Sequence, residues 1–387
     1  MMFGLSDKEI ESAGAMWTAH EVLQQPEVWA EVERLIAAEA HGLSEFLDPL
    51  LARPGRVVLT GAGTSAYIGE CLAPAFSRIV NGRVDAIPTT DLVANPRSYL
   101  SPLTPTLLVS FGRSGNSPES VAAVRLADAG IKHCAHLVVT CDAEGALAQY
   151  ARKHSYARVV TLPERSNDRS FAMTSSFTGM LLAGALTLGV VRGGRTQIPK
   201  LAQAAARVLP ESLPFQQELI GQGFERVVYL GAKELKGLAR EAALKMLELS
   251  DGKVVAVADS PLGFRHGPKT ILNSKTLVVV FRSNDDYTRQ YDRDLVDELR
   301  REGIAGRVVT LSAKAVDAHH EDDIVLGSAD AADLSDLELC LPYALFAQSI
   351  ALLRSLSLGC RPDNPNAAGT VSRVVKGVSI HPWRGSA

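Results

Sequence analysis

The chain repeats itself at an interval of 170 residues, and this repeat limits its possible folds more than any single motif does. Each copy carries an Arg-Val-Val run that leads to a Gly-Ala pair, then a run of apolar residues, then a Val-Val-Thr segment. The matched positions are Arg56 and Arg226, Leu107 and Leu277, and Thr140 and Thr310. Three predicted strands in constant register indicate two copies of one structural unit.

Within each copy, short apolar strands alternate with helical patterns. The strands expected in the first copy are 57–59, 84–87, 107–109, 137–140 and 159–161. This alternation predicts an α/β fold in which each copy is a doubly wound, mostly parallel sheet flanked by helices. The expected divisions are an N-terminal helical arm at 1–45, a first domain at 46–208, a second at 215–360 and a C-terminal tail at 361–387.

A loop rich in glycine and serine follows the predicted strand at 107–109. It reads Ser110-Phe111-Gly112-Arg113-Ser114-Gly115-Asn116-Ser117-Pro118-Glu119-Ser120 and precedes a helical pattern. Free backbone N–H groups and the start of a helix attract anions, and arginine and hydroxyl side chains suit a phosphate. The loop is predicted to bind the phosphate group of a small molecule. A plain turn whose serines cap the helix is the alternative.

The loop after the strand at 57–59 has the G-x-G-x-x-A spacing of dinucleotide-binding loops. The nicotinamide cofactor that this spacing suggests is the weaker interpretation. Asp85, the best candidate to hold its ribose, stands near the front of its strand instead of at the end. Thr64 and Ser65 suit a phosphate monoester better.

The equivalent loops of the second copy have diverged. Lys233-Glu234-Leu235 stands where the first copy has Gly63-Thr64-Ser65, and Ser283-Asn284-Asp285 stands where it has Arg113-Ser114-Gly115. An acidic loop repels phosphate. We therefore expect one phosphate site per chain, in the first copy.

Composition excludes several classes of protein. The net charge is −3 without a basic block, which argues against nucleic acid as a partner. The uncharged stretch 171–191 is interrupted by Gly, Ser and Thr, so a buried or interfacial helix is preferred to a membrane span. The start of the chain has no secretion signal, and the five cysteines form no C-x-x-C pair. We expect a cytoplasmic protein with reduced thiols.

The second copy contains candidate proton-transfer groups. Glu241, Lys245 and Glu248 are spaced to share one face of a helix, and His266 lies in a loop fixed by Gly-Pro. A carboxylate near a histidine is suited to moving protons on a sugar skeleton. A solvated, salt-bridged helix face is the alternative.

Other candidate residues carry weaker signals. His133-x-x-His136 and His319-His320 are considered as metal ligands, but no metal is expected. Thr18 to Glu21 has capping-box spacing and predicts a helix start. Trp17 and Trp29 are expected to anchor the N-terminal arm on a domain or a partner subunit in preference to facing a ligand.

The loops at 63–65 and 113–117 resemble those of SIS (sugar isomerase) domains, which bind phosphosugars. The segment from Glu241 to His266-Gly-Pro resembles the isomerase portion of glucosamine-6-phosphate synthase. Longer strings resemble the branch called tagatose-6-phosphate ketose/aldose isomerase or galactosamine-6-phosphate deaminase (AgaS-type). These strings are 89–92, 110–117, 263–268, 373–378 and 380–383.

This resemblance implies roles for individual residues. The implied phosphate-binding set is Ser65, Thr64, Arg113, Ser114, Gly115 and Ser117. Glu248 falls where the family's C1–C2 proton-transfer base lies, and His266 falls where a ring-opening histidine lies that a neighbouring subunit often supplies. The segment that lines the sugar is Ala172, Met173 and Thr174, and Lys245, Glu241 and Lys376 complete the implied catalytic set. Two positions depart from the family pattern, since Gly112 and Met173 replace more usual serines.

The sequence thus predicts a cofactor-independent enzyme that converts galactosamine 6-phosphate to tagatose 6-phosphate and ammonia. A ketose/aldose isomerase that releases no ammonia uses the same residues and remains open. A non-catalytic phosphosugar-binding regulator is the third alternative. A borrowed histidine requires at least a homodimer with shared active sites.

Overall fold

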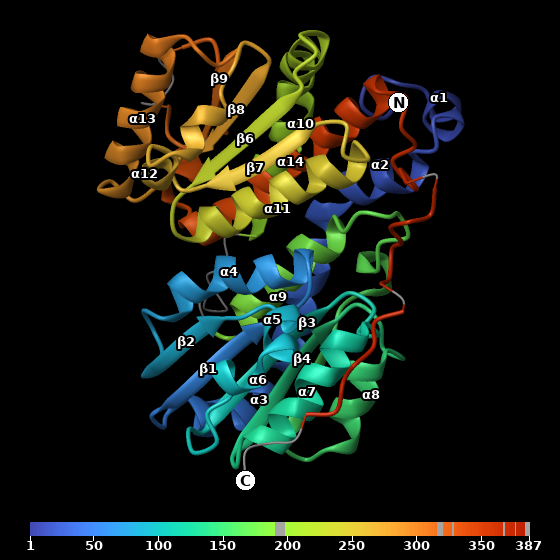
Figure 1. Cartoon of the computed structure of the whole chain (residues 1–387), viewed down its shortest axis with the longest axis vertical. Helices are drawn as coiled ribbons and strands as arrows, with labels where there is room; N and C mark the ends of the chain where they lie inside the picture. The colour runs from blue at the N-terminus through green and yellow to red at the C-terminus, as the bar shows by residue number, and fades with distance from the viewer. Residues whose placement is uncertain (190–197, 316–319, 327–328, 367, 376, 384–387) are drawn as a thin grey trace. The chain divides into compact units, whose positions relative to one another are not determined.

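The computed structural model describes residues 1–189, 198–315, 320–326, 329–366, 368–375 and 377–383. The chain forms two compact units, each assembled from separate segments around one five-stranded sheet (Figure 1). The first-copy unit consists of Val28–Asp168, Ser175–Thr196 and Ala368–Ala387. The second-copy unit consists of Met1–Glu27, Arg169–Thr174 and Gln197–Ala367. The limits of the functional domains expected above remain predictions.

The sheet of the first-copy unit is entirely parallel, with the order β2-β1-β3-β4-β5. Its strands are β1 (Gly55–Thr60), β2 (Gly82–Ala86), β3 (Thr106–Gly112), β4 (Cys134–Thr140) and β5 (Ala157–Thr161). Thr60 pairs with Ser110 across β1 and β3, and Gly112 pairs with Thr140 across β3 and β4. The loops that follow these strands therefore leave from one edge of the sheet.

Helices cover both faces of this sheet, as the alternating pattern predicts. A buried apolar cluster joins one face to α5 (Thr89–Ala94), α6 (Pro96–Tyr99), α7 (Pro118–Gly130) and α8 (Ala146–Lys153). The other face carries α4 (Thr64–Phe76) and α9 (Ser175–Thr187), which pack together. Helix α9 contains no charged residue and is buried from Ser175 to Ala185, which confirms the buried helix predicted in the stretch 171–191. A short 3-10 helix, η1 (Glu164–Ser166), precedes it.

The sheet of the second-copy unit repeats this design. Its order is β10-β9-β8-β6-β7, again all parallel. The strands are β6 (Arg226–Gly231), β7 (Val255–Asp259), β8 (Thr276–Phe281), β9 (Arg307–Ser312) and β10 (Asp323–Val325). Read from the β7 end, the second, first, third, fourth and fifth strands of this copy follow one another, which is the same order as in the first copy. The prediction of two copies of one α/β unit is confirmed.

The helices of the second-copy unit divide between the two faces in the same way. An apolar cluster joins one face to α12 (Pro261–Phe264) and α13 (Thr288–Glu302). On the other face, Phe281 stacks between Tyr229 and Tyr343, the last of which lies in α14 (Asp336–Ser357). Helices α10 (Ile198–Gly221) and α11 (Glu234–Leu249) pack against α14. Two further short helices among its described residues are η2 (Pro268–Ile271) and η4 (Ala329–Asp333).

The repeat extends to the backbone of the first loop in each copy. Gly63 has φ 56° and ψ −128°, and Lys233 has φ 51° and ψ −121° at the equivalent position. A Cβ atom on Gly61 would lie 2.6 Å from the backbone of Ser65, and one on Gly231 would lie 2.3 Å from the carbonyl oxygen of Leu235. Both copies therefore need the same tight turn between strand and helix.

The N-terminal segment contains α1 (Asp7–Ser12), α2 (Met16–Leu23) and the long α3 (Gln25–Leu51). The capping box predicted at Thr18 is wrong, because α2 begins two residues earlier and Thr18 lies inside it. The Thr18 hydroxyl instead donates to the Asp363 carboxylate at 2.8 Å. Trp29 is buried and its indole N–H donates to Thr178 at 3.0 Å, so it anchors α3 on α9 as expected.

One helix among the described residues, α14, is long and apolar enough to cross a membrane, but 94% of its most apolar window is buried inside the protein. A core helix has this property. All five cysteines are free thiols, and four of them are buried. Burial raises the pKa of Cys141 to about 12.

Candidate active site

The predicted phosphate loops leave the carboxyl edge of the first-copy sheet at adjacent strands. The loop 61–63 follows β1 and the loop 113–117 follows β3. The chain winds in opposite directions from these two neighbours, since β2 lies beyond β1 whereas β4 lies beyond β3. Crevices at such a reversal are where open α/β sheets bind ligands.

The serine loop presents backbone donors at this edge. The N–H groups of Ser114, Gly115 and Ser117 donate to no protein group in the described part of the chain. The Arg113 carbonyl is fixed because it accepts from the Cys141 N–H at 3.0 Å and from the Thr140 hydroxyl at 3.2 Å. Such free N–H groups beside a helix start form a concavity for an anion.

Ser117 also has a structural role. It is the N-cap of α7, where its hydroxyl accepts from the Ser120 N–H at 3.3 Å and donates to the Ser120 hydroxyl at 2.6 Å. This is the capping that the alternative interpretation of the loop predicts. The cap orients α7 so that its positive dipole end faces the loop.

Thr64 and Ser65 occupy the first turn of α4, which has thirteen residues, and both are buried. Arg113, also predicted to bind phosphate, begins the serine loop. It is only 6% exposed, and its guanidinium donates to the carbonyl oxygen of Arg373 in the C-terminal tail at 2.9 Å.

Asp85, the candidate for a nucleotide ribose, accepts hydrogen bonds from the side chains of Arg56 at 2.6 Å and Arg83 at 2.9 Å.

The predicted catalytic helix is α11 of the second-copy unit. Lys245 is fully buried, donates to the Glu248 carboxylate and lies 3.5 Å from that of Glu241. The three residues thus share one helix face, as their spacing predicts. Glu241 is buried, whereas the Glu248 side chain is 24% exposed. Glu248 therefore combines a firmly held position with access to a reactant, which is the arrangement a general base needs.

His266 lies on the loop between α12 and η2 and is exposed. Its neighbours are tied to α13, because Arg265 and Lys269 both form ion pairs with Glu298. These two cations lower the pKa of Glu298. The imidazole of His266 makes no hydrogen bond or ion pair with the residues that the structure describes. The loop backbone is therefore fixed while the ring stays accessible.

The segment predicted to line the sugar belongs to the second-copy unit. Ala172 and Thr174 are buried, and Met173 is half-buried. The carboxylate of Glu21 in α2 holds the start of this segment, since it accepts from the N–H of Ser170 at 3.2 Å and also from its hydroxyl. Sequence reasoning missed Glu21, because its partner lies 149 residues away. Lys376, the last member of the predicted catalytic set, lies outside the described residues.

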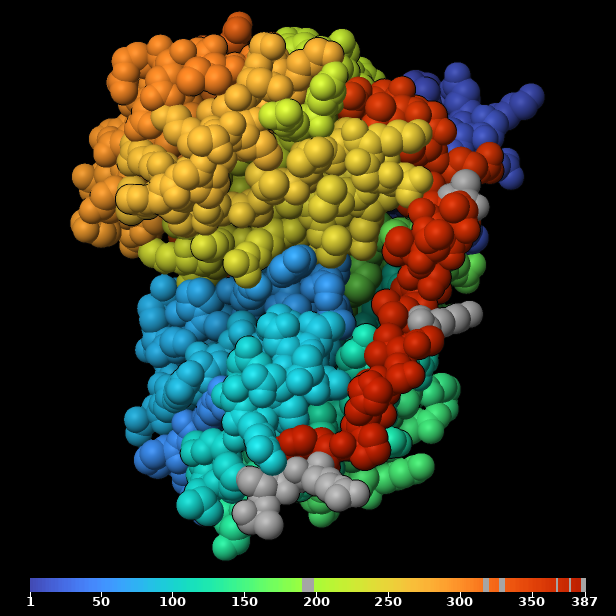
Figure 2. All heavy atoms as spheres, in the orientation of Figure 1, coloured from blue at the N-terminus to red at the C-terminus, as the bar shows by residue number. Residues whose placement is uncertain are grey.

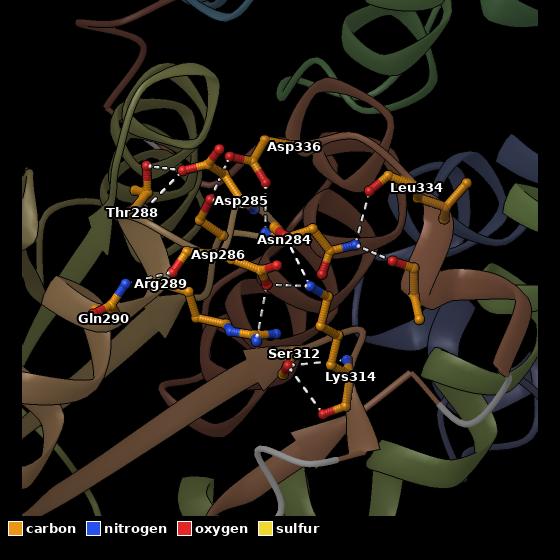
Figure 3. Close-up of polar contacts among 12 residues, drawn as sticks. Asn284, Asp285, Asp286, Thr288, Arg289, Gln290, Ser312, Lys314, Leu334 and Asp336 are labelled. Atoms are coloured by element: carbon orange, nitrogen blue, oxygen red, sulfur yellow. Dashed lines mark hydrogen bonds and ion pairs between the residues drawn. The ribbon is translucent and has the colours of Figure 1, made fainter.

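The equivalent edge of the second copy is filled by carboxylates (Figure 3). Asp336 accepts from the Ser283 hydroxyl at 2.6 Å and from the Asn284 N–H at 2.7 Å. Asp292 accepts from the Ser283 N–H at 2.9 Å. The Thr288 hydroxyl and N–H lower the pKa of Asp285 to about 2. The amide donors of Ser283 and Asn284 are thus occupied, which supports the prediction that phosphate does not bind there.

Of the candidate pair His133 and His136, His136 is part of the core, whereas His133 is exposed. His136 is buried on β4 with its Nε2 atom 2.9 Å from Asp128, and the Tyr150 hydroxyl donates to the other oxygen of this carboxylate at 2.6 Å. Burial lowers the pKa of His136. Within the described ranges, no group of three or more His, Cys, Asp and Glu side chains could hold a metal ion. His319 lies outside the described residues.

Comparison with known proteins gives consistent matches. A family model for the SIS domain matches residues 50–188. A Streptomyces coelicolor protein that carries the AgaS name is 49% identical over 371 residues, which cover 95% of this chain and 96% of the relative. The D-galactosamine-6-phosphate deaminase AgaS of Escherichia coli is 44% identical over 375 residues, which cover 96% of this chain and 97% of the relative. The crystal structure of tagatose-6-phosphate ketose/aldose isomerase from Escherichia coli superposes with a TM-score of 0.88 at 42% identity, covering 95% of this chain and 97% of that one.

Proposed function

The chain belongs to the SIS domain family, in its AgaS-type branch, and from this membership we propose that it converts galactosamine 6-phosphate to tagatose 6-phosphate and ammonia. The observation that carries the proposal is the 44% identity with the Escherichia coli deaminase over 96% of this chain. The free loop amides of the first copy and the Glu241–Lys245–Glu248 group of the second support it.

In the proposed mechanism, the first-copy loops hold the substrate phosphate and His266 assists opening of the sugar ring. Glu248 then removes the proton from C2 of the open-chain aldehyde, which gives an enolamine. Return of a proton to C1 leaves an imine at C2. Water adds to this imine and ammonia leaves, so that a ketose remains. The nitrogen and the carbonyl of the substrate carry the electron flow, and no cofactor takes part.

Lys245 suits a supporting role in this mechanism. A buried cation beside two carboxylates compensates much of their charge and fixes the Glu248 oxygen that it touches. Removing the cation would leave two carboxylates without compensation. We therefore assign Lys245 to positioning and charge compensation, and Glu248 to proton transfer.

We further propose a cytoplasmic homodimer or larger homo-oligomer with shared active sites, in which a neighbouring subunit supplies His266. The exposed imidazole supports a shared site, and the five free thiols suit a reducing compartment. Mixing Glu248→Gln chains with His266→Ala chains tests the shared site. Each variant alone is expected to be inactive, whereas mixed oligomers regain activity only if one intact site combines residues of both chains.

An isomerase that releases no ammonia is the second candidate, because the similar Escherichia coli structure bears the name of a ketose/aldose isomerase. The two reactions differ in whether the substrate carries an amine at C2. Ammonia and ketose should be measured with galactosamine 6-phosphate, glucosamine 6-phosphate and galactose 6-phosphate. Ketose formed from galactose 6-phosphate alone, without ammonia from either amine, would replace the deaminase proposal by the isomerase.

A further inference from the structure

The described residues of the C-terminal tail, 368–375 and 377–383, lie on the surface of the first-copy unit (Figure 2). Most of its apolar side chains face away from the protein, for example Val371 at 57% and Val375 at 54% exposed. Apolar burial along its length therefore does not explain how it is held. Two of the contacts made by its described residues serve as anchors, one at Arg373 and one at Trp383.

The first anchor connects the tail to the serine loop. The guanidinium of Arg113 donates to the carbonyl oxygen of Arg373 at 2.9 Å, across 260 residues of sequence. The Arg113 carbonyl accepts from Thr140 at the end of β4 and from Cys141, the next residue, so this arginine is fixed at its backbone and reaches the tail with its side chain. A movement of the tail here would strain the loop, and the reverse also holds.

The Arg373 side chain completes this anchor in the opposite direction. It donates to the carbonyl oxygen of Asp168 and lies 3.5 Å from the side-chain oxygen of Asn167. Asp168 is itself held, since its carboxylate accepts from the N–H groups of Ser175 at 3.1 Å and Ser176 at 2.9 Å at the start of α9. Arg373 thus accepts a hydrogen bond at its backbone carbonyl and donates hydrogen bonds through its side chain, and both contacts fix the tail at this residue.

The second anchor is Trp383, ten residues further along the chain. Its indole is half-buried against the apolar cluster that joins α7 to the sheet. A Cβ atom at Gly130 would lie 3.0 Å from Leu100 and 3.1 Å from the Trp383 ring, so the end of α7 leaves the space that the ring needs. The tail segment between the two anchors is therefore fixed at both ends.

We propose that Arg113 is a positioning residue that couples the C-terminal tail to the serine loop, and that it acts on phosphosugar binding through the tail and not as a phosphate ligand. The proposal rests on the proposed function for its ligand. Coupling is reciprocal: if tail docking favours the loop conformation that holds phosphate, phosphate must favour the docked tail to the same extent.

The test uses the full chain in four forms: wild type, Arg113→Lys, a released-tail form with Arg373→Ala and Trp383→Ala, and the triple variant. The probe is galactose 6-phosphate, which carries the phosphate but no amine. Its affinity is measured by calorimetry, and hydrogen exchange is followed in residues 368–383. Circular dichroism and urea unfolding check that every form folds, and Arg113→Gln serves as a second substitution if the lysine variant does not.

Arg113→Lys is expected to weaken binding by about five- to tenfold, a coupling near the lower end of the usual range, and to raise hydrogen exchange in the tail. In the released-tail form the same substitution should change the affinity by less than about twofold, because the link is already broken. Equal losses in both backgrounds would overturn the proposal and make Arg113 a direct ligand. An unchanged rate of tail exchange in Arg113→Lys would also overturn it.

These readouts separate the proposal from the proposed function. If galactosamine 6-phosphate yields no ammonia, the deaminase assignment fails while binding and exchange still decide the role of Arg113. Binding of galactose 6-phosphate that depends on the tail but not on Arg113 overturns this inference alone.

Discussion

The serine loop of the first copy and its counterpart in the second begin from nearly the same backbone. Both follow the third strand of a sheet with the same strand order, beside a first loop that turns in the same way. In the first copy the N–H groups of Ser114 and Gly115 donate to no described protein group. In the second, the N–H groups of the equivalent residues Asn284 and Asp285 donate to the Asp336 carboxylate and to the Ser283 hydroxyl.

This difference separates what the fold supplies from what the side chains decide. The repeat supplies donors at a strand reversal in both copies, which is suited to binding an anion. A carboxylate from the same chain can serve as that anion permanently, and it then stabilises the fold and leaves no site for a ligand. We infer that the first copy keeps its donors for substrate and that the second copy uses the same geometry for stability.

The largest effect is expected from Glu248→Gln, which tests whether proton chemistry resides in the second copy. Loss of a general base lowers kcat by about 10² to 10⁴-fold, while phosphosugar binding through the first copy should persist. Steady-state ammonia release and calorimetry with galactose 6-phosphate measure the two quantities. Glu225→Gln, which removes only an exposed carboxylate bound to Lys275, is the matched control. Normal turnover in Glu248→Gln would contradict the assignment.

Asp336→Ala tests the second-copy loop at 283–285, whose donors at Ser283 and Asn284 are bound by carboxylates of the same chain. It removes the acceptor of the buried Ser283 hydroxyl and of the part-buried Asn284 N–H, and should lower the free energy of unfolding by about 2–4 kcal/mol. The affinity for galactose 6-phosphate should not change. Urea unfolding monitored by circular dichroism gives the first quantity. A large loss of affinity in a variant that remains folded would show that the second loop takes part in binding.

Ser114→Ala tests the serine loop of the first copy. This variant should lose affinity for phosphosugar and keep its stability. A hydrogen bond to a charged group contributes about 1.5–3 kcal/mol, so the affinity for phosphosugar should fall roughly ten- to hundredfold with little change in stability. Unphosphorylated galactosamine serves as the control ligand, and its binding should be unaffected. Asn284→Ala is the matched variant 170 residues later. It should cost stability, because the Asn284 side chain donates to the Leu334 carbonyl at 2.7 Å, and leave binding intact.

The contrast also shows which parts of the molecule could be predicted from sequence. Strand positions, the repeat, and the helix face of Glu241, Lys245 and Glu248 depend on local patterns, and all three predictions were confirmed. Their physical cause is short-range, because burial of alternating or helical apolar positions fixes which side chains share a face.

Partners distant in sequence could not be predicted in this way. Asp336 lies 53 residues from Ser283, and nothing near either residue identifies the other. The capping box predicted at Thr18 failed for the same reason, since its hydroxyl bonds to Asp363, 345 residues away. The acidic residues of the loop itself predicted repulsion of phosphate, but the carboxylates that occupy the donors come from α13 and α14.

Lys233→Gly tests whether the shared turn strains the second copy. A residue with a Cβ atom at φ 51° and ψ −121° costs about 1–3 kcal/mol, and glycine relieves this. Loss of the ion pair with Asp285 and the added chain entropy offset part of the gain, so a net stabilisation of about 1 kcal/mol is expected. Gly63→Ala should instead destabilise the protein. A Cβ atom at this position would meet nothing within 4 Å, so the cost is purely conformational. Urea midpoints of both variants test the pair, and a destabilised Lys233→Gly would show that the turn carries no strain.

The smallest effect concerns Asp285, whose equivalent in the first copy is Gly115. Hydrogen bonds from Thr288 lower the pKa of Asp285 to about 2 in the folded chain, against about 3.9 for an unfolded aspartate. The carboxylate therefore adds stability above about pH 4, and this contribution is lost as the pH falls through 2. Because the side chain is 46% exposed, the contribution should be under about 1 kcal/mol. Urea midpoints of wild type and Asp285→Asn should differ at pH 6 and converge towards pH 3, where the wild-type carboxylate has lost part of its advantage. A difference in urea midpoint that is the same at pH 6 and pH 3 would mean that the charge of the Asp285 carboxylate does not contribute to stability.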